Sequence, residues 1–97
     1  MALIIKTDGS TQEELNKVVI DQLEWLQEKI GGYIECLSFS EPLVYNGKTY
    51  LGMMLNEEGK LQNLPVNKVA TSIAVKGGLR YDFIVGNVVL FSEGEID

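Results

Sequence analysis

The stretch Val44-Tyr-Asn-Gly-Lys-Thr-Tyr50 carries the clearest folding signal in the sequence. Its centre, Asn46-Gly47, supplies the two positive-φ positions that a type I′ turn requires, and β-branched and aromatic residues flank it. The stretch therefore predicts a two-residue β-hairpin. We expect the returning strand to run to about Leu55.

Three further strands are predicted in all, two before this hairpin and one after it. Residues 2–7 are rich in β-branched residues and predict a short first strand, and Tyr33–Phe39 predicts a second that is interrupted at Glu41-Pro42. Residues from Arg80 to Phe91 are apolar on both faces, which is typical of a strand in the centre of a sheet. Turn residues at 8–10 and 56–59 separate these elements.

A long helix is predicted from about residue 11 to residue 30. Thr11-Gln-Glu-Glu14 matches a capping box, in which the Thr and Glu side chains satisfy the first free amides of a helix. Gly31-Gly32 is expected to end the helix, because glycine accepts the left-handed cap conformation. Apolar residues recur at helical spacing and mark the expected core face: Leu15, Val19, Leu23, Leu26 and Ile30.

The segment from residue 65 to residue 75 is open to two interpretations. Pro65 suits the first turn of a short helix over about 65–73, whereas the alternation of apolar residues through Val75 also fits a strand. Taken together, the elements predict an α+β fold. It would hold an antiparallel or mixed sheet of about five strands packed on one long helix, with a short second helix.

Length and composition predict a single domain, because the chain has 97 residues and a mass of 10.8 kDa. The acidic tail, residues 93–97, is expected to be flexible. No apolar run approaches the roughly 20 residues of a membrane span, and Met1–Lys6 lacks the charged start of a signal peptide. A cytoplasmic protein with no membrane partner is therefore expected.

The residues that are missing limit the chemistry. The chain has no histidine and a single cysteine, Cys36, which excludes Ser–His and Cys–His nucleophile systems and an internal disulfide. We therefore expect a non-enzyme without a metal or cofactor, whose role is binding. The net charge is −6 and the basic residues are scattered, so a stable complex with nucleic acid is not expected. A small phosphate-bearing ligand is still compatible with this charge.

Polar residues after the predicted long helix suggest a nucleotide-like pocket. Tyr33 would stack on a base, Asn67 and Thr71 would share a helix face, and a glycine inside an apolar strand at Gly86-Asn87 suggests close approach to the backbone. Each segment also fits a purely structural role as a helix stop, a turn or a bulge. The candidate ligand-binding residues are Tyr33, Glu35, Asn67, Lys68, Thr71, Arg80, Gly86 and Asn87, with Lys76 as a further phosphate-neutralising cation.

Two large apolar residues lie off the core stripe of the predicted long helix. Trp25 falls on its flank and Ile20 lies well outside it. They would either cover the edge of the sheet or form a subunit contact, since exposed apolar groups mark interfaces. The second interpretation predicts a homo-oligomer.

Four short motifs, in order, resemble a known family. These are Gly-Gly-Tyr-Ile-Glu at 31–35, Asn-Glu-Glu-Gly-Lys at 56–60, Leu-Pro-Val-Asn at 64–67 and Ile-Val-Gly-Asn at 84–87. The pattern is similar to a family of small uncharacterised domains of phages, plasmids and other mobile elements, from which this chain departs by a longer hairpin at 43–55. The resemblance implies a protein made by an invader inside a bacterial cytoplasm.

Three classes of function follow. The first hypothesis is a non-catalytic phage immune-evasion protein, an oligomeric sponge that sequesters a cyclic-nucleotide-type signal. The alternative is a protein-interaction inhibitor of a host defence enzyme, such as an acidic anti-restriction mimic of DNA. An enzyme acting on nucleotides, with Glu35 and Asp82 as paired carboxylates, is the third.

Overall fold

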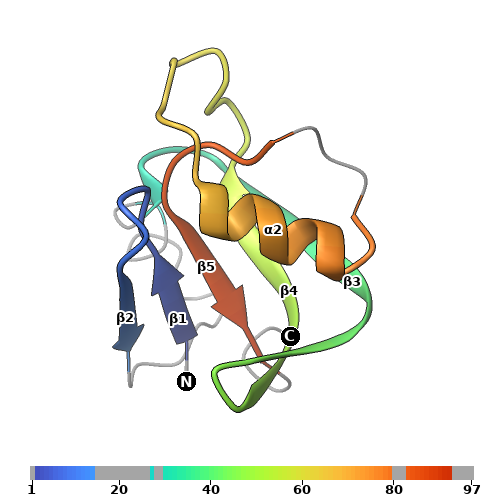
Figure 1. The fold of residues 1–97 in the computed structure, drawn as a ribbon. Coiled ribbons are helices and arrows are strands. Elements are labelled where there is room, and N and C mark those ends of the chain that lie inside the picture. Colours follow the sequence, from blue (N-terminus) through green and yellow to red (C-terminus); the bar gives the residue numbers. More distant parts are fainter. Residues whose placement is uncertain (1, 15–26, 28–29, 80–82, 93–97) are drawn as a thin grey trace.

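The computed structural model describes residues 2–14, 27, 30–79 and 83–92. Its strands form one antiparallel sheet in the order β2-β1-β5-β4-β3, and helix α2 lies across one face of it (Figure 1). The elements are β1 (Ala2–Ile5), β2 (Thr11–Glu14), β3 (Ile34–Tyr45), β4 (Lys48–Asn56), α2 (Lys68–Lys76) and β5 (Val88–Phe91).

The expected fold class, a sheet packed on one long helix with a short second helix, is wrong. Residues 11–14, the expected start of the long helix, form the edge strand β2, which pairs with β1. The rest of that expected helix, 15–26 and 28–29, lies outside the described residues. Within the described part of the chain, α2 is the single helix with assigned bounds, so the architecture there is a five-stranded antiparallel sheet carrying one short helix.

A tight turn explains why the capping-box pattern does not start a helix at Thr11. The Asp8 carboxylate accepts hydrogen bonds from the Ser10 backbone N–H at 2.8 Å and from Ser10 Oγ at 2.6 Å, which also lowers the pKa of Asp8. The Lys6 N–H donates to the Ser10 carbonyl at 2.9 Å. This turn sends the chain back along β1, and residues 11–14 pair with that strand instead of starting a helix.

The hairpin predicted at 44–50 is confirmed. Tyr45 pairs with Lys48, and Asn46 and Gly47 have φ of 50° and 79°, as a type I′ turn requires. The interruption predicted at Glu41-Pro42 is a shift of the β3–β4 register between Ser38 and Leu43 rather than the end of the strand. The strand therefore continues to Tyr45 with a local irregularity.

The last strand is central, as its apolar pattern predicts. β5 lies between β1 and β4, and all four of its residues are buried. It is shorter than the expected run from residue 80 to residue 91, because Gly86 has φ of +77° and turns the chain just before Val88. Residues 80–82 lie outside the described part of the chain.

Both faces of the sheet are covered by apolar side chains. On one face, α2 packs Ala70, Ile73 and Ala74 against the sheet, and the two alanines let the helix approach the strands closely. This i, i+3, i+4 set decides the segment at 65–75 in favour of a helix. On the other face, Ile30 packs in a smaller cluster with Ile4, Met54, Val89 and Phe91.

No helix in the described residues is long and apolar enough to cross a membrane.

Candidate functional site

The four sequence motifs meet at one end of the sheet. The Glu57 N–H donates to the Tyr33 carbonyl at 2.9 Å, which joins the first motif to the second. The third and fourth motifs are joined because the Gly86 N–H donates to the Pro65 carbonyl at 2.8 Å and the Asn67 N–H donates to the Ile84 carbonyl at 2.7 Å. The Leu64 N–H donates to the Gly59 carbonyl at 3.1 Å, which joins the second motif to the third, so hydrogen bonds connect all four motifs.

A cavity of about 390 Å³ opens beside Tyr33 on this surface, and we call it the Tyr33 pocket. The Tyr33 side chain is 66% exposed, so the ring offers an accessible face. The cavity size falls within the roughly 300–1,000 Å³ typical of small-molecule sites. The lining residues are Gln27, Gly32, Tyr33, Glu58 and Gln62.

A buried amide, Asn56, holds the walls of the Tyr33 pocket in place. Asn56 is 3% exposed; its Nδ2 donates to Gln62 Oε1 at 3.0 Å and its Oδ1 accepts from the Glu58 N–H at 2.8 Å. Gly32 lies directly against this amide, since a Cβ built there would come within 2.8 Å of Asn56 Nδ2. Packing against Asn56 therefore requires a glycine at position 32, whereas Gly31 is favoured by its φ of +91°.

The described residues that line the pocket offer hydrogen-bonding groups and an aromatic face but no cation. Because Gln62 uses its carbonyl oxygen on Asn56, its amide NH₂ is the group that it can offer to a ligand. Glu58 brings a carboxylate that accepts hydrogen bonds. These groups suit a flat, neutral or cationic ligand with donor groups on its edge.

Four of the predicted ligand-binding residues lie together but bond to the protein itself. Asn67 is fully buried at the start of α2: its Oδ1 accepts from the Ala70 N–H at 3.0 Å, and its Nδ2 donates to the carbonyls of Ile5 at 3.0 Å and Gly86 at 2.9 Å. Thr71 Oγ1 accepts from the Ile84 N–H at 2.8 Å. These bonds lock α2 onto β1 and onto the turn before β5.

The Asn87 side chain also bonds to the protein backbone. Its Oδ1 accepts from the Thr7 N–H at 3.1 Å, which fixes the end of β1 against the start of β5. The amide that interrupts the apolar pattern of the last strand thus serves as a structural link. Gly86 is buried, and its carbonyl accepts from Asn67.

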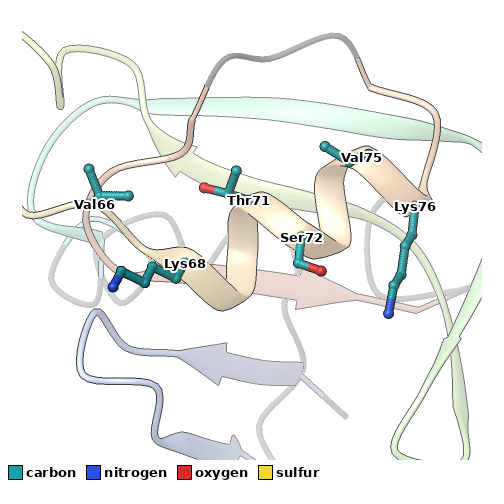
Figure 2. Close-up of a pocket in the computed structure, with 6 residues that line it drawn as sticks. All are labelled: Val66, Lys68, Thr71, Ser72, Val75 and Lys76. Carbon is teal, nitrogen blue, oxygen red and sulfur yellow. The ribbon is translucent and has the colours of Figure 1, made fainter.

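Lys68 lies on a different surface, the outer side of α2. Lys68 and Lys76 stand near the two ends of a shallow, mainly apolar groove of about 440 Å³ (Figure 2). Its apolar members Val66 and Val75 are 45% and 61% exposed. The groove is lined by Val66, Lys68, Thr71, Ser72, Val75 and Lys76.

Among the remaining predicted site residues, only Glu35 can be placed relative to the Tyr33 pocket. Glu35 is half-buried on β3 and does not line the cavity. Arg80 and Asp82, and the predicted interface residues Ile20 and Trp25, lie outside the described residues. Across the described residues, no three carboxylate or cysteine side chains gather in a way that could hold a metal ion.

Sequence reasoning singled out Tyr33 but missed Gln27, Glu58 and Gln62. The Asn-Glu-Glu-Gly motif contains Glu58, whereas Gln62 reaches the pocket because the turn at 57–63 folds back onto Asn56. One further contact lies in the same loops: Lys60 Nζ stands 4.4 Å from the centre of the Phe83 ring. Such cation–π pairs hold a lysine in place beside an aromatic face.

The chain belongs to the family described as a domain of unknown function (DUF3846), which it matches over residues 1–97. The expected membership of a family of small uncharacterised domains is thereby confirmed. None of the curated proteins and none of the solved structures gives a significant match.

Proposed function

We propose that this protein is a non-catalytic binding protein that holds a nucleobase-bearing small molecule in the Tyr33 pocket. The observation that carries the proposal is an exposed aromatic ring beside a cavity whose walls are fixed by a buried amide. Base stacking on an aromatic side chain contributes roughly 1–3 kcal/mol and tolerates different bases. Gln62 and Glu58 would read the edge of the base or the ribose hydroxyls.

Sequestration rather than turnover is proposed because the usual catalytic groups are missing. The sequence has no histidine. The Cys36 residue is exposed at the sheet edge, but partial burial desolvates the thiol and raises its pKa, which disfavours the reactive thiolate. Neither feature supports acid–base or nucleophilic chemistry at the Tyr33 pocket.

The specific form of the proposal is a sponge for a cyclic-nucleotide-type signal, made by a phage to evade host immunity. The phage setting rests on the family resemblance alone. The phosphate of such a ligand would need a cation from outside the pocket lining. Lys60 is the described lysine nearest in sequence to the lining residue Glu58, from which it is two residues away. A nucleoside or a cationic base would need no such partner.

Incubation with a panel of nucleosides, nucleotides and cyclic nucleotides tests this function. The protein is separated from free ligand and denatured, and the released molecules are identified by mass spectrometry. Release of an intact panel member supports sequestration, whereas release of a converted product identifies an enzyme. Retention of nothing from the panel contradicts the proposal and favours the alternative, an inhibitor that binds a host protein.

A further inference from the structure

The outer edge of β3 presents unpaired backbone groups. Among the described strands, β3 is the last of the sheet and pairs along one side only, with β4. Because the Glu57 N–H donates to the Tyr33 carbonyl, the pair Tyr33–Glu57 continues the ladder as a hydrogen-bonded pair. Antiparallel pairs alternate, so Glu35 and Leu37 also direct their N–H and C=O groups toward β4.

The alternate residues Ile34, Cys36 and Ser38 therefore direct their backbone groups away from the sheet. Cys36 and Ser38 are exposed, and no segment in the described part of the chain pairs with this edge. The next outward-facing residue, Ser40, is already paired, since its N–H donates to the Gly77 carbonyl at 2.8 Å. The open edge thus consists of Ile34, Cys36 and Ser38, and it ends before Ser40.

The rest of β3 carries the features with which proteins protect an edge strand. The register shift between Ser38 and Leu43, together with Glu41 and Pro42, disrupts regular pairing beyond Ser40. No proline, lysine or register shift protects the three outward-facing residues. The contrast between the two halves of one strand indicates a partner for the unprotected half.

We propose that this open edge pairs with the same edge of a second copy of the chain, which joins two five-stranded sheets into one. A two-fold axis at Cys36 pairs Cys36 with Cys36 of the partner subunit and Ile34 with the partner's Ser38. All the outward N–H and C=O groups of the three residues then find partners.

The side chains are compatible with this register. Glu35 lies opposite the partner's Leu37, so the two Glu35 carboxylates are not placed opposite each other. Ile34 and Leu37, which are half-buried in one copy, gain further cover from the second sheet. The contact is short, and contacts of this size form weak, concentration-dependent dimers. This inference does not depend on the ligand proposed for the Tyr33 pocket.

Thiol cross-linking at Cys36 tests the register. Hydrogen-bonded antiparallel pairs have Cα atoms about 5.5 Å apart, which lies within the range of a disulfide. Diamide is the oxidant: it takes up the two protons and two electrons released when two Cys36 thiols form one disulfide. We expect a covalent dimer on a non-reducing gel. Sedimentation should show a dimer fraction that grows from micromolar to millimolar protein.

A shifted thiol is the matched control. The double variant Cys36→Ser/Ser38→Cys keeps one exposed thiol on the same edge, but the register places it roughly 14 Å from its counterpart. Its yield should be at least about fivefold lower, because that distance exceeds disulfide reach. Equal yields for the two proteins would overturn the proposal, as would a monomer at every concentration.

Blocking the edge gives a second readout. Ser38→Pro removes an outward N–H, a change that edge strands tolerate, and should abolish both cross-linking through Cys36 and the dimer fraction. If this variant does not fold, Ser38→Lys tests the same point, because a lysine on an edge opposes strand addition. A folded variant that cross-links like the parent contradicts the proposed edge pairing.

Discussion

Asn67 Nδ2 donates a hydrogen bond to the Ile5 carbonyl at 3.0 Å, which joins the start of α2 to the end of β1 across 62 residues of sequence. The same side chain caps the helix through Ala70 and holds the turn at Gly86. One fully buried amide therefore connects three segments that the sequence keeps far apart.

Replacing Asn67 with alanine should destabilise the protein by about 2–4 kcal/mol. The change removes a helix cap, typically about 1 kcal/mol, and leaves two carbonyls without their donor at about 1–3 kcal/mol each, partly offset by relaxation. Asn67→Ser keeps a capping oxygen but shortens the reach to Ile5 and Gly86, so its loss should be smaller. Urea denaturation measures both, with the exposed neighbour change Lys68→Ala as the control. An Asn67→Ala protein as stable as this control would contradict the assigned role.

Gly86→Ala should cost more stability than Gly47→Ala. Both glycines have positive φ, 77° and 79°, so the strain of placing an L-residue there is similar, about 1–2 kcal/mol. A Cβ at Gly86 would also come within 2.9 Å of Leu64 Cδ1, whereas one at Gly47 meets nothing within 4 Å. Denaturation midpoints compare the two variants. Equal losses would mean that Leu64 moves aside without cost.

Tyr33→Leu should weaken binding of the panel member retained by the parent protein by about tenfold or more. Loss of a stacking ring costs roughly 1–3 kcal/mol, and about 1.4 kcal/mol is tenfold in affinity. Tyr33→Phe keeps the ring and should bind within a few-fold of the parent. Because the side chain is exposed, neither change should alter folding. Calorimetric titration measures affinity, and unchanged binding by the Leu variant would remove Tyr33 from the site.

The Cys36 thiol should titrate at higher pH in the folded protein than in the unfolded chain. Desolvation raises its pKa in the folded state, so that state holds the proton over a pH range in which the unfolded chain has lost it. Stability from this group is therefore present below the unfolded pKa and falls as pH rises through the folded pKa. The pH dependence of iodoacetamide alkylation, in buffer and in urea, measures both midpoints. A folded midpoint at or below the unfolded one would contradict the expectation.

Some elements of the fold could be predicted from the sequence and others could not. The hairpin at 44–50 follows from two residues that need positive φ, and the central position of β5 follows from its apolar residues on both faces. The start of β2 at Thr11 could not be predicted, because the capping-box pattern describes only what a helix would do with these residues. A turn closed by Asp8 and Ser10 instead sends these residues back along β1, where they pair as a strand.

Several of the predicted site residues also fall into two groups, those that line the Tyr33 pocket and those that bond to the chain itself. Tyr33 was selected as a ring that could stack on a base. Asn67 and Thr71 were selected because they would share a helix face, and Gly86 and Asn87 because they interrupt an apolar strand. The structure shows them bonded to backbone groups. A buried amide in an apolar pattern needs hydrogen-bond partners. Its neighbours in sequence do not show whether a ligand or the chain itself supplies those partners.

The sequence by itself determined the type I′ turn at Asn46-Gly47 and the apolar character of the last strand, because these depend on residues within a few positions of each other. Tertiary structure decided which strand lies at the edge, which amides are already satisfied, and that Gln27, Glu58 and Gln62 surround Tyr33. Those outcomes depend on pairings between distant segments. A hydrogen-bonding group takes whichever partner the whole fold brings within reach.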